Sequence, residues 1–162
     1  MDMNATIIDR LWRLALWCAY RLALCCWFFF RPHSGGVYVA VWCGSRILLI
    51  RNSYRTWYNF PCGGQRFRES LIAAAVRELA EEVGIEVEPA DLIYIGSFSS
   101  TREYRRDRST LYELHLNTEP TVKIDQREVM WASFVEAELA RTLDLADIPN
   151  QYLASKADKL CH

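Results

Sequence analysis

The sequence predicts an α/β domain in which helices cover both faces of a mixed β-sheet, preceded by an N-terminal apolar helix. Two β-rich runs come first, an amphipathic helix over 70–83 follows, and further strands and a terminal helix complete the pattern. A breaker cluster over 31–36, Arg-Pro-His-Ser-Gly-Gly, separates this pattern from an apolar run over 10–30. We therefore place an N-terminal helical segment at residues 1–34 and the α/β domain at residues 35–162.

The length and charge of the chain fit this division. Its 162 residues accommodate one domain with an extension, and 51% hydrophobic and 24% charged residues are ordinary for a globular protein. The formal net charge of -1 provides no overall basic field, so the composition argues against bulk nucleic-acid binding.

Four arginines in and directly after the apolar run, Arg10, Arg13, Arg21 and Arg31, fall within an arc of about 80° on a helical wheel. A basic stripe beside Trp, Phe and Leu is typical of a helix that lies in a membrane interface. A helix packed on its own domain or on a partner is a second interpretation. A membrane span is a third, although Arg21 interrupts the cleanest apolar stretch. A cleaved signal peptide does not fit, because no small-residue cleavage site precedes Arg31-Pro32.

The cysteines show no C-x-x-C pair and no zinc-site spacing. There are six of them: Cys18, Cys25, Cys26, Cys43, Cys62 and Cys161. We interpret them as reduced, small apolar residues of a cytoplasmic protein. A cytoplasmic protein could also associate with a membrane through residues 10–31.

The domain begins with a predicted hairpin. Its strands are 37–43 and 46–51, joined by the two-residue turn Gly44-Ser45. A loop over 52–60 leads to the helix 70–83. Ser70 suits the N-cap of this helix, and Gly84 suits the left-handed position after its last turn.

The second half of the domain alternates strands with polar loops. An arginine-rich loop over 99–109 separates two of the strands, and a loop over 117–126 precedes the last strand. The predicted strands are 92–98, 109–116 and 127–134, and the predicted helices are 135–142 and 149–159.

The helix 70–83 presents a cluster of carboxylates. Glu78, Glu81 and Glu82 fall on one side of it, opposite an apolar stripe that includes Leu79 and Val83. Like charges this close destabilise an isolated helix. We therefore expect a positive group over them, and a divalent metal is the natural candidate.

This stretch resembles the Nudix box, G-x5-E-x7-R-E-U-x-E-E-x-G-U with U aliphatic. Every fixed position is present in residues 63–85: Gly63, Glu69, Arg77, Glu78, Leu79, Glu81, Glu82, Gly84 and Ile85. The resemblance covers about residues 36–160 and implies the family's α/β/α sandwich. It also implies a Mg²⁺- or Mn²⁺-dependent hydrolase, in which water attacks the pyrophosphate of a nucleoside diphosphate linked to another moiety.

The resemblance also implies roles for individual residues. Glu78 and Glu82 would be the principal metal ligands, and Glu81 would be a further ligand or hold a metal-bound water. Arg77 would pair with Glu69 and orient the catalytic helix. The backbone carbonyl of Cys62, the residue before Gly63, would also bind the metal.

The sequence departs from the family pattern at two positions. Cys62 stands where the family usually has Gly, and a positive φ there would strain a cysteine. Arg68 stands before Glu69, where Gly is common. Neither change removes a catalytic group.

Many Nudix enzymes use an additional acidic residue on a later loop, six residues before a Trp. The matching position here, counted from Trp131, is Asp125, which the resemblance makes a candidate accessory metal ligand, with ordinary surface charge as the other interpretation. Glu128 is the alternative, and Glu103 in the arginine-rich loop is a third candidate for the base or ligand.

The substrate-binding candidates lie outside the box. Arg51, Arg55 and Arg105 are suited to phosphate oxygens, because Arg binds them in a bidentate manner. Trp57, Trp42 and Tyr58 are candidates for stacking on a base, with packing in the core as the alternative. The expected partner is a small nucleotide-type diphosphate. Open alternatives are a lipid-linked diphosphate hydrolysed at a membrane and a non-catalytic nucleotide sensor, and a homodimer is compatible with either.

Overall fold

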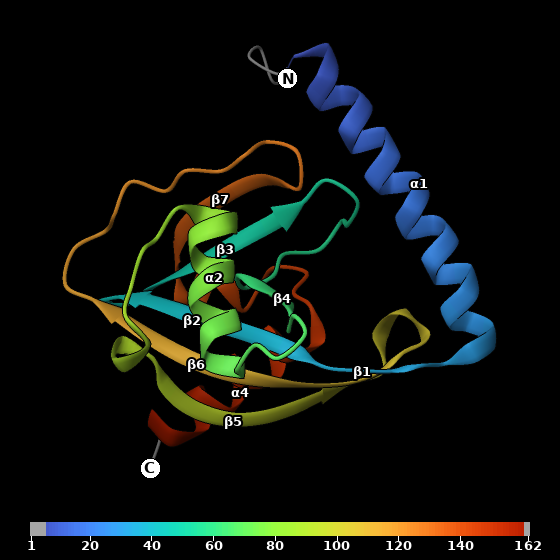
Figure 1. Ribbon diagram of the computed structural model, residues 1–162. Helices are drawn as coiled ribbons and strands as arrows, with labels where there is room; N and C mark the ends of the chain where they lie inside the picture. Colours follow the sequence, from blue (N-terminus) through green and yellow to red (C-terminus); the bar gives the residue numbers. More distant parts are fainter. Residues whose placement is uncertain (1–5, 161–162) are drawn as a thin grey trace.

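A seven-stranded mixed sheet forms the middle layer of the protein (Figure 1). The computed structural model describes residues 6–160. Its strands are β1 (His33–Ser34), β2 (Gly36–Cys43), β3 (Arg46–Asn52), β4 (Cys62–Gly64), β5 (Ile93–Ser100), β6 (Arg106–Leu116) and β7 (Val129–Glu136). Its helices are α1 (Ile7–Phe30), α2 (Leu71–Val83), α3 (Ala137–Ala140) and α4 (Asp147–Leu160), with short 3₁₀ helices η1 (Pro89–Asp91) and η2 (Arg102–Tyr104).

Strand pairing confirms the mixed sheet. The main order is β1-β6-β2-β3-β7, while β4 pairs with β2 and β5 pairs with β6. Strands β2 and β6 run parallel from Val37 opposite Thr110 to Cys43 opposite Leu116. The β2–β3 and β3–β7 pairs are antiparallel. The predicted Gly44-Ser45 turn joins β2 to β3, and Gly44 has a φ of 59°.

The two faces of the sheet are covered by different helices, because side chains alternate along β2. Val37, Val39 and Val41 pack with α2 in one buried cluster. Ala40 and Trp42 pack on the other face with residues of α4. Figure 1 shows α2 in front of the sheet and α4 behind it. The expected three-layer sandwich is therefore confirmed.

Several predicted boundaries were wrong in the second half. β6 begins at Arg106 instead of Ser109, because its first residues pair with β1 and β5. The last strand runs over Val129–Glu136 instead of 127–134, and the predicted helix 135–142 is reduced to Ala137–Ala140. Pairing with β3, which sets Arg46 opposite Glu136, carries the chain on as a strand where local sequence favours a helix.

Helix α1 contacts the domain along one narrow stripe. The part-buried residues of the helix recur at a spacing of three or four: Asp9, Arg13, Leu16, Tyr20, Ala23, Leu24 and Trp27. No residue of α1 is fully buried. By length and composition α1 is the one helix among residues 6–160 that could cross a membrane. One side of α1 therefore packs on its own domain, as one of the three interpretations expects. The two membrane interpretations apply to the opposite, exposed side of the helix.

The cysteines of the described residues are free. They are Cys18, Cys25, Cys26, Cys43 and Cys62. Cys161 lies outside the described residues.

Candidate active site

Helix α2 begins and ends where the sequence predicts. The Ser70 hydroxyl accepts a hydrogen bond from the Ala73 N–H at 3.2 Å. Gly84 is left-handed, with a φ of 68°, and its N–H bonds back to the carbonyls of Ala80 and Leu79. These caps fix which residues of α2 face the sheet and which face the acidic side.

Arg77 ties α2 to the loop before it. Its guanidinium donates to both Glu69 carboxylate oxygens, at 2.8 Å and 2.9 Å, and to the Gly64 carbonyl at 2.8 Å. It also bonds Glu78 at 2.7 Å and Glu81 at 3.0 Å. Hydrogen bonds from Arg77 and from the Arg66 N–H lower the pKa of Glu69 to about 2. The expected Arg77–Glu69 pair is thus present in the structure.

Gly63 lets strand β4 approach α2 closely. A Cβ built on Gly63 would lie 2.0–2.5 Å from the carboxylate atoms of Glu78, which is far inside contact distance. The same construction on Gly64 meets no atom within 4 Å. The glycine that opens the box is therefore required by the position of Glu78 and not by a turn.

Two of the box carboxylates are shielded from water. Glu82 is 7% exposed and accepts a 2.8 Å hydrogen bond from the Cys62 N–H. Burial raises the pKa of Glu82 well above its usual range, and the neighbouring charges of Glu128 and Glu78 add to this. Burial also raises the pKa of Glu78, against the lowering effect of Arg77. Both carboxylates would be stabilised as anions by a cation close to them.

An acidic cavity of about 220 Å³ lies beside α2. Its carboxylates come from both the box and the loop before β7: Glu78, Glu81, Glu82, Asp125 and Glu128. Carboxylate oxygens are the ligands that Mg²⁺ and Mn²⁺ prefer, so this donor set fits a hard divalent cation. Within residues 6–160 no three His, Cys, Asp or Glu side chains lie close enough together to share one ion. Arg77 forms ion pairs with both Glu78 and Glu81.

Cys62 adopts ordinary strand geometry. It pairs with Tyr38 of β2 and is not among the residues with positive φ, so the strain considered from the sequence does not arise. Its N–H points to Glu82. Because the N–H and C=O of one residue point to the same side of an extended strand, the Cys62 carbonyl also faces α2. This orientation suits the ligand role expected of that carbonyl.

Asp125 and Glu128 differ in what their carboxylates contact. One Asp125 oxygen accepts the backbone N–H groups of Arg127 and Glu128, at 2.9 Å and 3.2 Å, and so caps the turn before β7. Glu128 accepts a 2.8 Å hydrogen bond from the Tyr54 hydroxyl. Glu128 lines the acidic cavity and also a second cavity, which places it at their junction.

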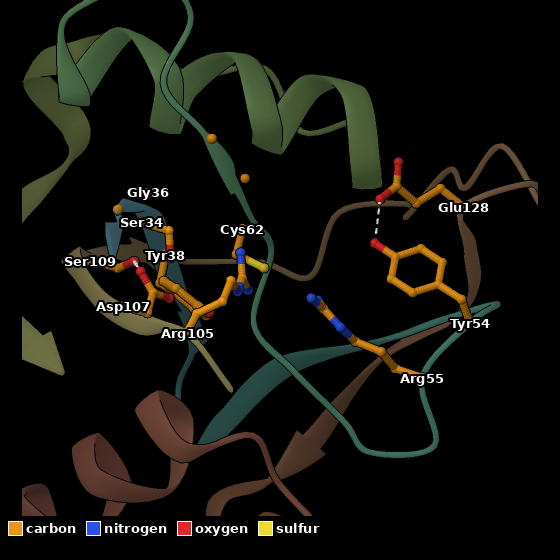
Figure 2. Close-up of a pocket in the computed structure, with 13 residues that line it drawn as sticks. Ser34, Gly36, Tyr38, Tyr54, Arg55, Cys62, Arg105, Asp107, Ser109 and Glu128 are labelled. Carbon is orange, nitrogen blue, oxygen red and sulfur yellow. Dashed lines mark hydrogen bonds between the residues drawn. The ribbon is translucent and has the colours of Figure 1, made fainter. Parts of the chain in front are cut away.

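The second cavity has a volume of about 260 Å³ (Figure 2). Its charged lining residues are Arg55, Arg105, Asp107 and Glu128, and we call it the basic cavity after its two arginines. Figure 2 shows the guanidinium groups of Arg55 and Arg105 on the two sides of the space beside Cys62. Glu103 holds both of them: it bonds Arg55 at 2.9 Å and 3.2 Å and Arg105 at 2.7 Å. Arginines in this position, next to an acidic cavity, have the chemistry suited to phosphate oxygens.

The sequence missed how these arginines are held: Glu103, a candidate base or ligand there, pairs with them and does not line the acidic cavity. The Tyr20 hydroxyl of α1 donates to Glu103 at 2.7 Å, and the Arg55 guanidinium lies over the rings of Tyr20 and Tyr54. Burial would raise the pKa of Glu103, but Arg55 and the Tyr20 hydrogen bond lower it. Glu103 has a φ of 61°, so this turn is strained. The arginine density of loop 99–109 was the only signal for it in the sequence.

The other substrate candidates lie further out. Arg51 is exposed and its guanidinium lies over Tyr58, away from both cavities. The ring of Trp57 lies under Arg102 at 4.4 Å and lines a cavity of about 550 Å³ between α1 and the domain, which shares Tyr54 and Arg55 with the basic cavity. Trp42 is buried on the opposite face of the sheet with α4. Of the predicted substrate-binding residues, Arg55 and Arg105 therefore lie beside the start of the Nudix box, and Trp57 lies in the adjoining cavity.

The family model of the NUDIX domain matches residues 32–157, and the chain therefore belongs to the Nudix family. It is a Nudix hydrolase that acts on pyrophosphate bonds. No curated protein matches this chain in sequence.

Solved structures with the same fold include enzymes of several specificities. The E. coli dihydroneopterin triphosphate pyrophosphohydrolase is 20% identical, with a TM-score of 0.62 over 75% of this chain and 92% of that chain. The bifunctional NMN adenylyltransferase/ADP ribose pyrophosphatase of Francisella tularensis, complexed with AMP and a Mn ion, is 14% identical, with a TM-score of 0.70 over 91% and 47%. The NUDIX domain of Shewanella oneidensis NrtR, complexed with ADP ribose, is 14% identical, with a TM-score of 0.65 over 80% and 88%. At these identities the matches establish the fold.

Replacing Gly63 by Ala should displace the Glu78 carboxylate and lower kcat by about 100-fold, the loss expected when a catalytic group moves by about 1 Å. Gly64→Ala is the matched control, because its added methyl meets no atom, and its loss should be far smaller. Steady-state hydrolysis rates and a thermal melt of each variant test this. Equal losses in the two variants would contradict the close approach of β4 to Glu78.

Replacing Arg68 by Gly should stabilise the fold. Arg68 is exposed and has a φ of 62°, and a left-handed conformation costs a non-glycine residue about 1–2 kcal/mol. The greater freedom of Gly in the unfolded chain offsets about 0.5–1 kcal/mol of this gain. Urea unfolding should show a higher midpoint at an unchanged slope. Arg66→Gly, in the same loop but without positive φ, should not stabilise; stabilisation by both variants would contradict the conformational cause.

Proposed function

We propose that this protein is a Mg²⁺- or Mn²⁺-dependent pyrophosphohydrolase whose substrate is a nucleoside diphosphate linked to another moiety. The observation that carries the proposal is the contact between the acidic cavity and a cavity that contains two arginines. Carboxylates of the box line one, and Arg55 and Arg105 line the other, with Glu128 at their junction. With a metal in the acidic cavity, a diphosphate lying across that junction would meet the metal on one side and the arginines on the other.

The proposed mechanism assigns a role to each side of the junction. Glu78 and Glu82 would hold the metal with the Cys62 carbonyl, and Glu81 would support them. When bound, the metal would offset phosphate charge and activate the attacking water. Arg55 and Arg105 would bind phosphate oxygens and keep the diphosphate in line with that water.

We infer that Glu128, more than Asp125, acts as the accessory acidic group. The Tyr54 hydroxyl fixes its carboxylate where the acidic and basic cavities meet. In that position it would accept a proton from the water that attacks the diphosphate. Asp125 supports it indirectly, because its carboxylate holds the backbone N–H of Glu128 at 3.2 Å.

A lipid-linked diphosphate is a second candidate, favoured by one observation. The cavity of about 550 Å³ between α1 and the domain includes Leu24 and Trp57 and adjoins Arg55. An apolar group attached to the diphosphate could extend into it, as could the base or sugar of a nucleotide.

The test is a substrate panel with Mg²⁺, with Mn²⁺ and with EDTA. It contains nucleoside triphosphates, ADP-ribose, a dinucleoside polyphosphate and a prenyl diphosphate, and product formation is followed by liquid chromatography. We expect metal-dependent cleavage of a nucleotide member. Cleavage of the prenyl diphosphate alone would favour the second candidate, and failure on every member with both metals would refute the proposal.

Glu82→Gln should lower turnover of the best panel substrate by roughly 100-fold or more, because it removes the charge of a metal ligand. The fold should remain, since the amide oxygen can still accept the Cys62 N–H and a buried charge is lost. Glu86→Gln, an exposed glutamate beyond the box, is the control. Turnover in Glu82→Gln equal to that in Glu86→Gln would show that Glu82 is not a ligand.

Tyr20→Phe should raise KM by up to about tenfold with little change in kcat. A hydrogen bond to a charged group contributes about 1.5–3 kcal/mol, and its loss frees Glu103 and the arginines it holds. Burial raises the pKa of Tyr20 to about 12, so its hydroxyl remains a donor at neutral pH. Tyr104→Phe is the control, because the Tyr104 ring contacts Phe28 of α1, the helix that also carries Tyr20. A KM change of the same size in both variants would contradict the role of the Tyr20 hydroxyl.

A further inference from the structure

The outward side of α1 is an uncovered apolar surface. At about 100° per residue, one line of residues lies opposite the stripe that contacts the domain. This outward face consists of Ile7, Leu11, Leu14, Cys18, Leu22, Cys25 and Phe29, all exposed. Leu14 is 58% exposed, Leu22 69% and Phe29 79%. In Figure 1, α1 stands at the edge of the molecule.

The apolar surface extends beyond this line. Trp12 and Phe30 continue it on one side, and Trp17 and Phe28 continue it on the other. Of the 17 large hydrophobic residues that are most exposed among residues 6–160, ten belong to α1. A monomeric soluble protein rarely exposes so continuous an apolar patch unless it binds something there.

The arginines of α1 and of its C-cap lie along one side of this surface. Arg10, Arg21 and Arg31 are exposed, and Arg21 lies over the Trp17 ring at 5.0 Å. Asp9, which is part-buried, is paired with Arg127 of the domain at 3.1 Å. The exposed residues of Ile7–Phe30 therefore include cations and no carboxylate, which is complementary to an anionic surface.

We propose that α1 binds the surface of an anionic lipid bilayer through its outward face while its inner stripe stays on the domain. An apolar arc flanked by arginines and tryptophans is the form of a helix that inserts to about 5–10 Å in the interface. With side chains a helix is about 10–12 Å wide, so the outward face can insert without pulling the inner stripe off the domain.

Two other occupants fit less well. A second copy of α1 would cover only a narrow seam, whereas the apolar arc spans about half of the helix circumference. A membrane span would place Asp9, Arg13 and Arg21 in hydrocarbon and break the contacts of Asp9 and Tyr20 with the domain. An interfacial position keeps both contacts.

Vesicle flotation of the full-length protein tests the proposal. We expect it to float with vesicles of phosphatidylcholine and phosphatidylglycerol, less with phosphatidylcholine alone, and less as salt rises. The emission of its tryptophans should be quenched by brominated lipid. Protein that stays at the bottom of the gradient with both vesicle types would overturn the proposal.

A matched pair of variants locates the binding face. Leu14→Glu, on the outward face, should reduce the bound fraction at least tenfold. Leu139→Glu, at a leucine of α3 with 56% exposure against 58% for Leu14, should bind like the wild type. The helical circular dichroism of both should be unchanged, because neither side chain is covered. Equal loss in both variants would overturn the assignment of the face.

Two measurements exclude the other occupants. Alkaline carbonate should release the wild-type protein from the vesicles, and resistance to extraction would indicate a span. Light scattering without lipid should give the same mass for the wild type and Leu14→Glu. A wild-type dimer that Leu14→Glu dissociates would assign the face to a second copy instead. None of these readouts depends on the substrate or on catalysis.

Discussion

The site depends first on the guanidinium of Arg77. It contacts Glu69, Glu78, Glu81 and the Gly64 carbonyl at once, so one cation joins the loop before α2 to the acidic side of that helix. Without it, adjacent carboxylates on α2 would repel each other in a partly buried space. The close approach of β4 to α2 places the Cys62 N–H on Glu82, and it is tolerable only because residue 63 has no Cβ to meet the Glu78 carboxylate.

A second cluster mirrors the first with the charges reversed. There, the carboxylate of Glu103 joins the cations Arg55 and Arg105, as Arg77 joins carboxylates beside α2. The two clusters meet at Glu128 and Tyr54. A diphosphate carries charges that complement the basic cluster, and a metal complements the acidic one, so each ligand would also reduce the repulsion that hinders the other.

The sequence predicted the acidic cluster well and the basic cluster poorly. Spacing along one helix sets the first, so Arg77, Glu78 and Glu82 could be placed from residues 63–85 alone. The second joins loop 52–60, the turn at Glu103 and Tyr20 of α1, which lie far apart in sequence. Strand β4 was missed because three residues with two glycines carry no strand signal; pairing with β2 forms it. Arg51 was likewise proposed from the sequence as a phosphate ligand, but its guanidinium lies over the Tyr58 ring.

Helix α1 belongs to both the site and the surface. Its inner stripe supplies Tyr20 to the cluster that holds Arg55, and its outward face carries the apolar arc. The strained turn at Glu103 needs this support, because a non-glycine residue at a φ of 61° persists only where its surroundings fix it. If a bilayer fixes α1 and α1 fixes the arginines, linkage makes the effect reciprocal: a diphosphate bound at Arg55 would strengthen membrane binding by the same factor. Substrate affinity would then depend partly on whether α1 rests on a bilayer.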